Sequence, residues 1–506
     1  MEKFDNRKII PDFDYSREQR EAIAFIDMKS FYASCEAVAL KKNPLEVSLC
    51  VMSKADNSAG LILASSPVFK KVFQKNNVGR AYELPFYIHN RKFNYKNYYQ
   101  HAPFNLDTNR PDPPDPEYVK YIEYWAKRTI ITPPRMSLYI EQNMKIQHII
   151  QNYSSTDDMH WYSIDEGFVN LSSSLSYFYP DSKDENRKMS KAVKLDLLSR
   201  DIQRAILKET GIYSTVGMSL GNPLLAKLAL DNEAKHTSNM RAMWTYENIP
   251  EKIWKIKELT DFWGINTRTE KRLNKLGVQS VYDLAHTNPR ILKKEFGVIG
   301  VQLFFHANGI DSSSVYEKYQ SKSNSLGNSQ ILPRNYTRKT EIEIVIKEMA
   351  EQVAIRMRRK KKQTTTVSLG LGFASDGGEG RTRGIYKQLT VEPTNSTHKL
   401  VAAVLTLFQK NYIGGSVRQV AVSYGNLIDD DFKLISLFDT VNTEQIKKEN
   451  KKEKVDDVVD EIRDRFGFLA IQKATSLSEG SRVVARSKLV GGHSAGGLDG
   501  LETKNG

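Results

Sequence analysis

"AFIDMKSFYASCEAV" (residues 24–38) places one carboxylate, Asp27, at the end of a short apolar run and follows it with two aromatic residues, Phe31 and Tyr32. The apolar run predicts a buried strand that ends at Asp27, and the pattern behind it predicts a helix with Ser30 as its N-cap. An ordinary strand-to-helix turn would explain this stretch by itself. The rest of the chain decides whether Asp27 has a further role.

A second acidic stretch, "HWYSIDEGFVNLSS" (residues 160–173), has β-type runs on both sides of Asp165, Glu166 and Gly167. Adjacent residues in a straight strand point to opposite faces, so the two carboxylates can share a ligand only at a turn or a strand end, and the glycine predicts that turn. With Asp27 they would form a set of oxygen ligands of the kind that Mg²⁺ prefers. A plain Asp-Glu-Gly hairpin is the alternative for this stretch alone.

The chain as a whole is long, basic and poor in cysteine. Its 506 residues predict three or four domains. No stretch approaches the ~20 consecutive apolar residues of a membrane span, and the N-terminus lacks the pattern of a signal peptide, so we expect a cytoplasmic protein without a membrane partner. The two cysteines, Cys35 and Cys50, cannot build a disulfide framework or a structural zinc site.

The net charge of +14 favours a polyanionic partner, and nucleic acid is the leading candidate. "IRMRRKKKQ" (residues 355–363) holds six cations and no acid directly before a β-type run. This run predicts an edge that faces phosphates, and a solvated surface is the alternative. The predicted DNA contacts are Arg356, Arg358, Arg359, Lys360, Lys361, Arg381 and Arg383.

Local patterns predict several further elements. A hairpin is expected at residues 46–66 and an irregular insertion rich in Tyr, Asn and Pro at 91–118. A helix is expected at 195–211, ended by Gly211, and a strand with a second helix at 212–236. The remaining expectations are two short helices within 258–285, a Ser-rich linker at 309–329, a separate domain of strands and helices at about 325–439, an exposed amphipathic helix after residue 442 and a mostly disordered tail from about residue 476.

Three motifs in order, "FIDMKSFYASCE", "YSIDEGFVNLS" and "GMSLGNPLLAKLALDNEAKH", resemble the lesion-bypass DNA polymerases of the Y family, in the UmuC-like branch of Gram-positive bacteria, their plasmids and phages. The resemblance covers residues 22–439. It implies an α+β multidomain fold shaped as a right hand. The implied domains are an N-terminal extension (1–21), a palm (22–31 and 111–245), small fingers with the insertion (32–110), a helical thumb with a helix-hairpin-helix (246–315), a linker (316–327), an α/β little finger (328–440) and a C-terminal helix with a flexible tail (441–506).

The resemblance also implies catalytic roles. Asp27 and Asp165 would bridge two Mg²⁺ ions, for which Mn²⁺ could substitute, Glu166 would complete the site on the primer side, and the carbonyl of Met28 would add a ligand beside the triphosphate. Phosphoryl transfer of this kind needs no protein nucleophile. Tyr32 matches the family's sugar gate.

Nucleotide binding is implied for several further residues. Phe31 would pack beside the gate, with plain core filling as the alternative, and Lys235 matches a family lysine that reaches the triphosphate. Lys227, earlier on the same predicted helix, could contact DNA or be solvated. The fingers depart from the family, because "ASSPVFKKVF" lacks the Tyr and Arg that many relatives use there. The substitutes are Ser65, Lys70 and Lys71, and the sequence does not choose between the lysines.

Two further motifs imply contacts with DNA and with the replication machinery. "FWGINTRTEKRLNKLGV" (residues 262–278) resembles a helix-hairpin-helix whose turn, at Gly264 and Asn266, would offer N–H groups to a phosphate. Asn266 replaces the usual second glycine and would tolerate a left-handed backbone there. "LISLFD" (residues 434–439) resembles peptides that dock on the sliding clamp, with core filling as the alternative. Its predicted contacts are Leu434, Ile435, Ser436, Leu437 and Phe438.

The expected function is that of an error-prone translesion polymerase that binds primer-template DNA and deoxynucleoside triphosphates and acts in DNA damage tolerance and the SOS response. A two-metal nuclease would use the same carboxylates but has no need of a sugar gate or a triphosphate lysine. A non-catalytic DNA-binding protein with a polymerase-like fold would not need all three carboxylates.

Overall fold

The structure is a computed structural model, which describes residues 8–53, 60–75, 79–105, 107, 109–182, 188–317, 324–374, 384–430, 443–490 and 493–494. The chain divides into two compact units whose main segments are Met1–Tyr319 and Gln320–His493. None of the helices within the described ranges has the length and apolar character needed to cross a membrane. Both cysteines are buried and free.

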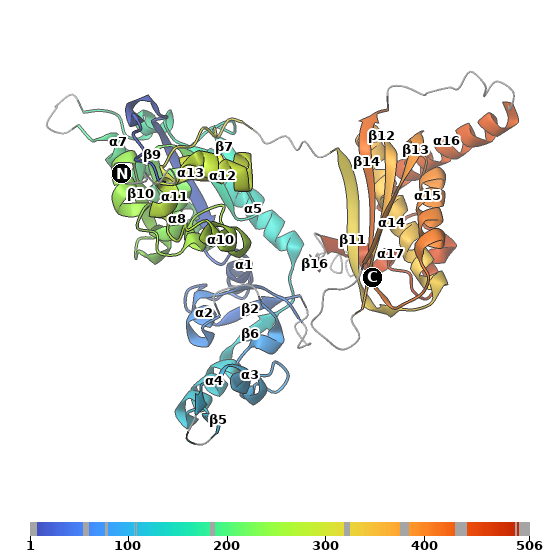
Figure 1. Cartoon of the computed structure of the whole chain (residues 1–506), viewed down its shortest axis with the longest axis horizontal. Helices are drawn as coiled ribbons and strands as arrows, with labels where there is room; N and C mark the ends of the chain where they lie inside the picture. The colour runs from blue at the N-terminus through green and yellow to red at the C-terminus, as the bar shows by residue number, and fades with distance from the viewer. Residues whose placement is uncertain are drawn as a thin grey trace, which may run out of the picture. The chain divides into compact units, whose positions relative to one another are not determined.

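A five-stranded sheet forms the centre of the first unit, with the strand order β10-β9-β1-β8-β7 (Figure 1). The predicted strand through residues 24–27 is the middle strand, β1, and its interior residues are buried because it pairs on both edges. Gly217 in β9 lets helix α8 approach, since an added Cβ would lie 2.1 Å from the carbonyl oxygen of Ala226. The bounds are β1 Glu21–Met28, β7 Met159–Trp161, β8 Glu166–Asn170, β9 Ser214–Gly221, β10 Arg241–Trp244, α5 Met136–Gln151, α6 Ser174–Phe178, α7 Lys191–Thr210 and α8 Pro223–Asn232.

The predicted helix at 195–211 is confirmed, and the predicted helix over 222–236 is wrong in its last turn. Helix α7 ends at Thr210, and Gly211 follows in the left-handed conformation, with a φ of 71°. Helix α8 ends at Asn232, and a separate 3₁₀ turn, Ala234–His236, follows it. Lys235 therefore lies on a different element from the helix that carries Lys227.

The predicted turn at Asp165-Glu166-Gly167 is also wrong in its position. The chain reverses before Glu166, where the N–H groups of Tyr162 and Ser163 both donate to the Glu166 carbonyl. Gly167 lies inside β8, facing the Trp161 ring, and an added Cβ would approach this ring to 2.4 Å. The glycine makes room for a neighbouring ring, and it is the reversal before β8 that places Asp165 and Glu166 at a strand end.

A smaller three-stranded sheet, with the order β3-β2-β6, follows β1 and α1 in the chain. The predicted hairpin is confirmed by the antiparallel pairing of β2 with β3. Ser30 precedes α1 as predicted, but its side chain makes no capping bond and its φ is 50°. The bounds are α1 Phe31–Ala39, β2 Leu49–Met52, β3 Ile62–Ser65, α2 Pro67–Phe73, α3 Tyr95–His101, β4 Phe104–Asn105, β5 Arg110–Pro111, α4 Pro116–Arg128 and β6 Ile130–Thr132.

Short helices complete the first unit, and the N-terminal segment packs against them. Phe13 and Tyr15 contact their apolar core, and the Tyr15 hydroxyl donates to the Asn308 carbonyl at 3.0 Å. The predicted helices within 258–285 are present. The bounds are α9 Ile249–Lys252, α10 Thr267–Lys275, α11 Val281–Ala285, α12 Pro289–Phe296 and α13 Val298–Ala307.

The second unit is a four-stranded antiparallel sheet, in the order β11-β14-β12-β13, with helices α14 and α15 packed on it (Figure 1). The predicted separate domain of strands and helices is therefore present. The bounds are β11 Ser325–Tyr336, α14 Lys339–Arg359, β12 Lys362–Phe373, β13 Gly384–Thr394, α15 Thr397–Asn411 and β14 Val417–Asp429.

A C-terminal extension packs on this unit through charged side chains. The predicted helix is present as α16 (Thr443–Phe466), and its Arg463, which is buried, pairs with Glu351 of α14 at 2.9 Å. The described part of the tail is ordered, contrary to prediction, because Arg486 of α17 (Val483–Ser487) pairs with Glu348 at 2.8 Å. The short strands β15 (Leu489–Val490) and β16 (His493–Ser494) follow.

Candidate active site

The predicted carboxylates lie together at one end of β1 and β8. The backbone register pairs Asp27 directly with Glu166, so their side chains leave the same face of the sheet. Asp165 immediately precedes β8, and its carbonyl accepts a hydrogen bond from the Met28 N–H at 2.9 Å. Three acidic residues that are distant in the sequence therefore form one acidic edge.

Two lysines neutralise this acidic edge. The Lys227 ammonium, whose side chain is only 8% exposed, lies 3.0 Å from Glu166 Oε2 and 4.4 Å from the centre of the Phe25 ring. Lys235 lies 3.3 Å from Asp27 Oδ2. Asp231 joins the two, because its carboxylate is 3.2 Å from Lys227 and 2.8 Å from Lys235. Lys227 is therefore neither solvated nor free to contact DNA as it lies here.

The charges of the acidic edge shift several pKa values. Burial raises the pKa of Asp27 to about 6, with help from the carboxylates of Asp165 and Glu166 and against the attraction of Lys235. Burial alone would lower the pKa of Lys235, but Asp27 and Asp231 outweigh it and raise that pKa above its ordinary value. Burial therefore outweighs the attraction of Lys235 at Asp27.

As the side chains lie, no three acidic, His or Cys groups among the described residues surround a common point that would hold a metal ion. Two of the three carboxylates are turned to lysines, and Asp165 accepts a hydrogen bond from the Ser163 hydroxyl at 2.8 Å. The donor types nevertheless suit a hard cation, since carboxylate oxygens are its preferred ligands.

The predicted gate residue Tyr32 is held by a stack of rings. Its ring lies parallel to that of Tyr139 on α5, with centroids 4.3 Å apart and an angle of 12°. The Tyr139 hydroxyl donates to Glu36 at 2.8 Å, and Arg135 binds the same carboxylate. Phe31, in contrast, is buried. Burial, with a smaller contribution from the charge of Asp165, raises the pKa of Tyr32.

The two lysines of α2 differ in position. Lys70 donates to the Ser30 hydroxyl at 3.3 Å, and burial lowers its pKa within the field of Asp27, Lys235 and Lys29. Lys71 is exposed, and Ser65 is buried in β3. Lys70 is therefore the lysine of this helix that lies near the acidic edge.

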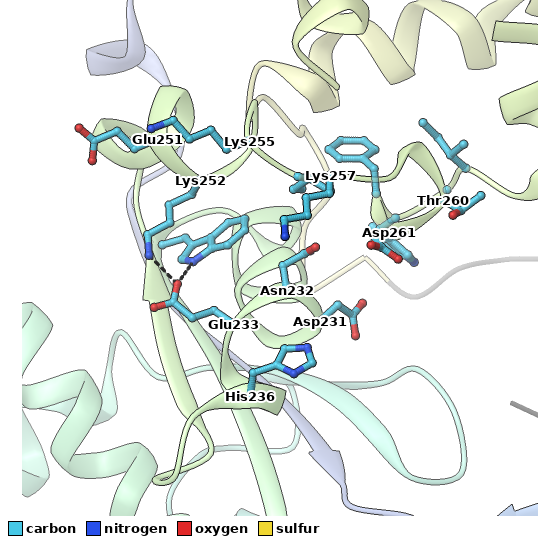
Figure 2. Close-up of a pocket in the computed structure, with 16 residues that line it drawn as sticks. Asp231, Asn232, Glu233, His236, Glu251, Lys252, Lys255, Lys257, Thr260 and Asp261 are labelled. Atoms are coloured by element: carbon cyan, nitrogen blue, oxygen red, sulfur yellow. Dashed lines mark hydrogen bonds and ion pairs between the residues drawn. The ribbon is translucent and has the colours of Figure 1, made fainter. Parts of the chain in front are cut away.

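A cleft of about 1100 Å³ begins at Asp231, the carboxylate that joins Lys227 and Lys235 (Figure 2). Its walls come from the end of α8, the 3₁₀ turn behind it, Trp244 of β10 and the segment from Glu251 to Ile265, and they include three lysines and four acidic residues. Glu233 anchors one wall, because its carboxylate accepts hydrogen bonds from Trp244 Nε1 and Lys252 Nζ, as the dashed lines in Figure 2 show.

Gly264 of the predicted helix-hairpin-helix also lines this cleft and has a φ of 96°. Asn266 does not adopt the expected left-handed backbone: its φ is −101°, and its side chain caps α10 by accepting hydrogen bonds from the N–H groups of Arg268 and Thr269, both at 2.9 Å. Asparagine replaces glycine here because the position needs a cap.

The cationic run spans the end of α14 and the start of β12. Arg358 is 10% exposed and pairs with Asp460 of α16 at 2.7 Å, and Arg359 pairs with Asp464 of the same helix. Arg356, Lys360 and Lys361 are exposed. Of the other predicted contacts, Arg381, Arg383 and the clamp-like residues Leu434, Ile435, Ser436, Leu437 and Phe438 lie outside the described residues.

Comparison with known proteins places the chain in a family. Residues 117–231 match the impB/mucB/samB family, 323–437 match its C-terminal domain, and 246–278 match the helix-hairpin-helix motif of the same family. UvrX of Bacillus subtilis (strain 168), whose name refers to repair of UV damage, is 34% identical over 481 residues, which cover 95% of this chain and 99% of UvrX. The protein named DNA polymerase IV 2 of the same organism is 30% identical over 482 residues, covering 94% and 99%.

This chain belongs to the Y family of DNA polymerases. Its relatives place it in the UmuC-like branch, and it is a DNA-directed DNA polymerase. A Y-family DNA polymerase chimera of Dbh and Dpo4 has the same fold, with a TM-score of 0.55 and 18% identity over 81% of this chain and 99% of the chimera. The predicted palm, fingers, thumb and little-finger architecture is thus confirmed.

The sequence motifs did not reveal several residues that the structure brings to the site. Asp231 had a signal, because it lies four residues from each of Lys227 and Lys235 within the third motif. Lys29 follows the predicted strand directly and lies in the field of Asp27. Tyr139 had no local signal, since only the tertiary fold brings α5 against α1.

Proposed function

We propose that this polymerase extends primers opposite damaged template bases by phosphoryl transfer with two divalent metal ions, as part of the cell's response to DNA damage. The observation that carries the proposal is the acidic edge, where Asp27 and Glu166 lie opposite each other and Asp165 adjoins them. The name of UvrX, which refers to repair of UV damage, supports the part that concerns damage tolerance.

The acidic edge would hold Mg²⁺, with Mn²⁺ as a substitute. Asp27 and Asp165 would be the main ligands, Glu166 would complete the site on the primer side, and the Met28 carbonyl would add a ligand. The donor types support this, because carboxylate and carbonyl oxygens are the ligands that Mg²⁺ prefers. The bound ions would activate the primer 3′ oxygen and neutralise charge on the leaving pyrophosphate.

The lysines near the acidic edge would have two different roles, namely orienting a carboxylate and binding the triphosphate. Lys227 is buried and would stay with Glu166 to fix the orientation of this carboxylate. Lys235 is 39% exposed, so it can leave Asp27 and bind the triphosphate. Lys70 would bind the triphosphate from the fingers side, since it lies in the field of Asp27, and Lys71 and Ser65 are less suitably placed.

Tyr32 would exclude ribonucleotides. Its ring is stacked on Tyr139 and therefore cannot move aside without breaking that contact. A 2′ hydroxyl would have to displace the ring, and overpacking by one or two heavy atoms costs ~1–3 kcal/mol. Phe31 would support the floor of the site from within the core.

DNA would be held by several parts of the chain. The cleft that runs from Asp231 to the Gly264 turn would take the primer strand, with its lysines near the phosphates and the turn N–H groups as donors. In the little finger, Arg356, Lys360 and Lys361 are exposed and would contact phosphates, together with Arg381 and Arg383. The peptide at residues 434–438 would dock on the sliding clamp.

A primer-extension assay tests the proposal. Purified protein with Mg²⁺ is incubated with labelled primer on an undamaged template and on one with an abasic site. We expect elongated primers on both, including products longer than the abasic position. Primers that stop before the abasic site would contradict the lesion-bypass role, and primers that shorten would favour the two-metal nuclease.

A further inference from the structure

The fingers insertion carries a surface of exposed aromatic rings that none of the roles above uses. The rings come from α3, α4 and the segments beside them, at the end of the first unit remote from the five-stranded sheet (Figure 1). Between residues 79 and 128, every large apolar side chain that is exposed among the described residues is aromatic. These side chains are Tyr82, Tyr95, Tyr99, Phe104, Tyr118, Tyr121 and Tyr124.

Helix α4 presents three of these rings as one stripe. Tyr118, Tyr121 and Tyr124 follow one another at intervals of three residues, so they lie along one side of the helix about 4.5 Å apart along its axis. They are 38%, 45% and 50% exposed. An adjacent side of the helix, with Ile122 and Ala126, is fully buried in the fingers core. Tyr121 and Tyr124 therefore lie outside the described fingers core, whereas Tyr118 touches this core through Phe93.

The rings of α3 continue this stripe. Phe93, which is buried, contacts Tyr118 on one side with centroids 5.9 Å apart and Tyr95 on the other with centroids 5.0 Å apart. Tyr95 in turn stacks beside Tyr99 at 6.5 Å. The stripe of α4 and the rings of α3 thus form one connected aromatic face.

Cations accompany the aromatic face. The Arg128 guanidinium lies over the Tyr124 ring, 3.5 Å from its centre, and Lys96 and Lys127 are exposed on the same two helices. One acid of α4, Glu117, pairs with Lys120 at 2.8 Å, and another, Glu123, accepts a hydrogen bond from the Phe93 N–H. The face therefore combines exposed rings with positive charge.

We propose that the aromatic face binds single-stranded DNA, namely the unpaired template of the polymerase's own substrate, by stacking bases on the tyrosines. Sites for single strands combine aromatic rings, on which bases of any sequence stack, with cations that follow the backbone. Tyrosine and arginine are enriched in protein–protein interfaces as well, but lysine, which accompanies the rings here as Lys96 and Lys127, is depleted in them. A DNA polymerase always has an unpaired template strand ahead of the primer end, so the ligand is present whenever the enzyme works.

Binding of oligonucleotides to the full chain tests the proposal. The probes are a thymine oligonucleotide of about 20 nucleotides, longer than the usual site of one binding module, and a blunt duplex of equal length. The double variant Tyr121→Ala, Tyr124→Ala should bind the single strand at least about tenfold more weakly, since each stacked base contributes ~1–3 kcal/mol. It should bind the duplex like the wild type and keep the salt dependence, because no charge is removed.

Two control variants make the result specific. The double variant Tyr121→Phe, Tyr124→Phe should keep the affinity, because phenyl rings stack as well as phenol rings. Tyr177→Ala removes a tyrosine that is 81% exposed on α6 of the same unit and should change nothing. Equal losses for the single strand and the duplex, or a loss with the Phe variant as large as with the Ala variant, would overturn stacking. Unchanged binding by the Ala variant would overturn the proposal and leave the face to a protein partner.

Primer extension supplies a second readout. On templates with an overhang of about 20 nucleotides, the Ala double variant should extend primers less efficiently than the wild type. On templates with an overhang too short to reach the aromatic face, the two proteins should extend primers equally well. An equal change on both kinds of template would contradict a role for the face in holding the template.

Discussion

The acidic edge of the palm and the cationic run of the little finger are each a cluster of residues with the same sign of charge. The counter-charges that neutralise the two clusters differ in how exposed they are. At the acidic edge the counter-charges are Lys227 and Lys235, and Lys235 remains 39% exposed. At the cationic run Arg358 meets Asp460 of α16, and these side chains are only 10% and 13% exposed. An exposed ammonium group can exchange its partner for a substrate, whereas the loss of one member of a buried pair leaves an uncompensated charge that destabilises the fold.

The comparison shows that neighbouring residues of one charged run can have different roles. Arg358 and Lys360 are two residues apart in one basic run, yet Arg358 pairs with Asp460, about a hundred positions later, and Lys360 is exposed. The run therefore contains a structural part and a part that is available to DNA. Substitutions that separate these parts, and that compare them with the acidic edge, test this division.

The largest effect is expected at the acidic edge. Asp165→Ala or Glu166→Ala should lower the rate of nucleotide addition by about a thousandfold or more, because removal of a metal ligand takes away several kcal/mol of transition-state stabilisation. Binding of primer-template should stay within a few fold. Single-turnover extension and a DNA-binding titration measure the two quantities, and near-normal extension by either variant would refute the assignment of these ligands.

A large effect on stability is expected for the buried part of the run. Arg358→Ala should destabilise the second unit by ~3 kcal/mol, because Asp460 would remain as a buried, unpaired charge. All five tryptophans precede residue 319, so tryptophan fluorescence follows the first unit only, while circular dichroism follows both. The unfolding transition seen by circular dichroism should shift, and the one seen by fluorescence should not.

Arg359→Ala is the matched control, since its pair with Asp464 is about half exposed on both sides. Exposed pairs contribute ~0–1 kcal/mol, so this variant should unfold almost like the wild type. Equal shifts for Arg358→Ala and Arg359→Ala would show that burial does not separate the two pairs.

A smaller effect is expected at the nucleotide. Tyr32→Ala should raise incorporation of ribonucleotides relative to deoxynucleotides by about tenfold or more, because the clash of ~1–3 kcal/mol with the 2′ hydroxyl disappears. Phe31→Ala should lower incorporation of both sugars alike, since Phe31 is a core residue. Competition between the two nucleotides in a single turnover measures the ratio, and an unchanged ratio for Tyr32→Ala would show that its ring is only core filling.

The smallest effect is expected for the exposed part of the run. Lys360→Ser with Lys361→Ser should weaken binding to DNA of any sequence and lower the log–log salt slope by ~0.9 for each duplex phosphate that the protein no longer neutralises. Thermal unfolding should stay the same. A salt slope equal to that of the wild type would assign these two lysines to solvent.

The sequence predicted the carboxylates of the acidic edge but not the contacts that neutralise either cluster, and the reason is physical. Asp27, Asp165 and Glu166 could be predicted as one set because each lies at or beside the end of a strand and the motifs around them resemble one family. The pairing of β1 with β8 brings these ends together. The Lys227–Glu166 contact could not, since it depends on how α8 packs on β1. In the same way, the basic run gave no sign of α16, whose acids reach it only through the tertiary fold.

The roles of a capping residue and of a glycine were also difficult to predict from the local sequence. Asn266 was expected to replace a left-handed glycine, but it caps α10, and both roles suit an asparagine. Gly167 was expected to form a turn, but it makes room for Trp161, which only the paired strands reveal. Residue type restricted each position to a few roles, and the neighbours in space selected one.

Metal binding tests the role of the acidic edge most directly. Mn²⁺ is titrated into the protein with primer-template and a non-hydrolysable deoxynucleoside triphosphate, and uptake by the nucleotide alone is subtracted. We expect about two ions per chain for the wild type, as in two-metal sites generally. Asp27→Asn should weaken their binding by about tenfold or more, because it removes a charged ligand without changing shape. Asp196→Asn, which alters a carboxylate 42% exposed on α7, should bind like the wild type. Wild-type affinity in Asp27→Asn would contradict the assignment of the acidic edge as the metal site.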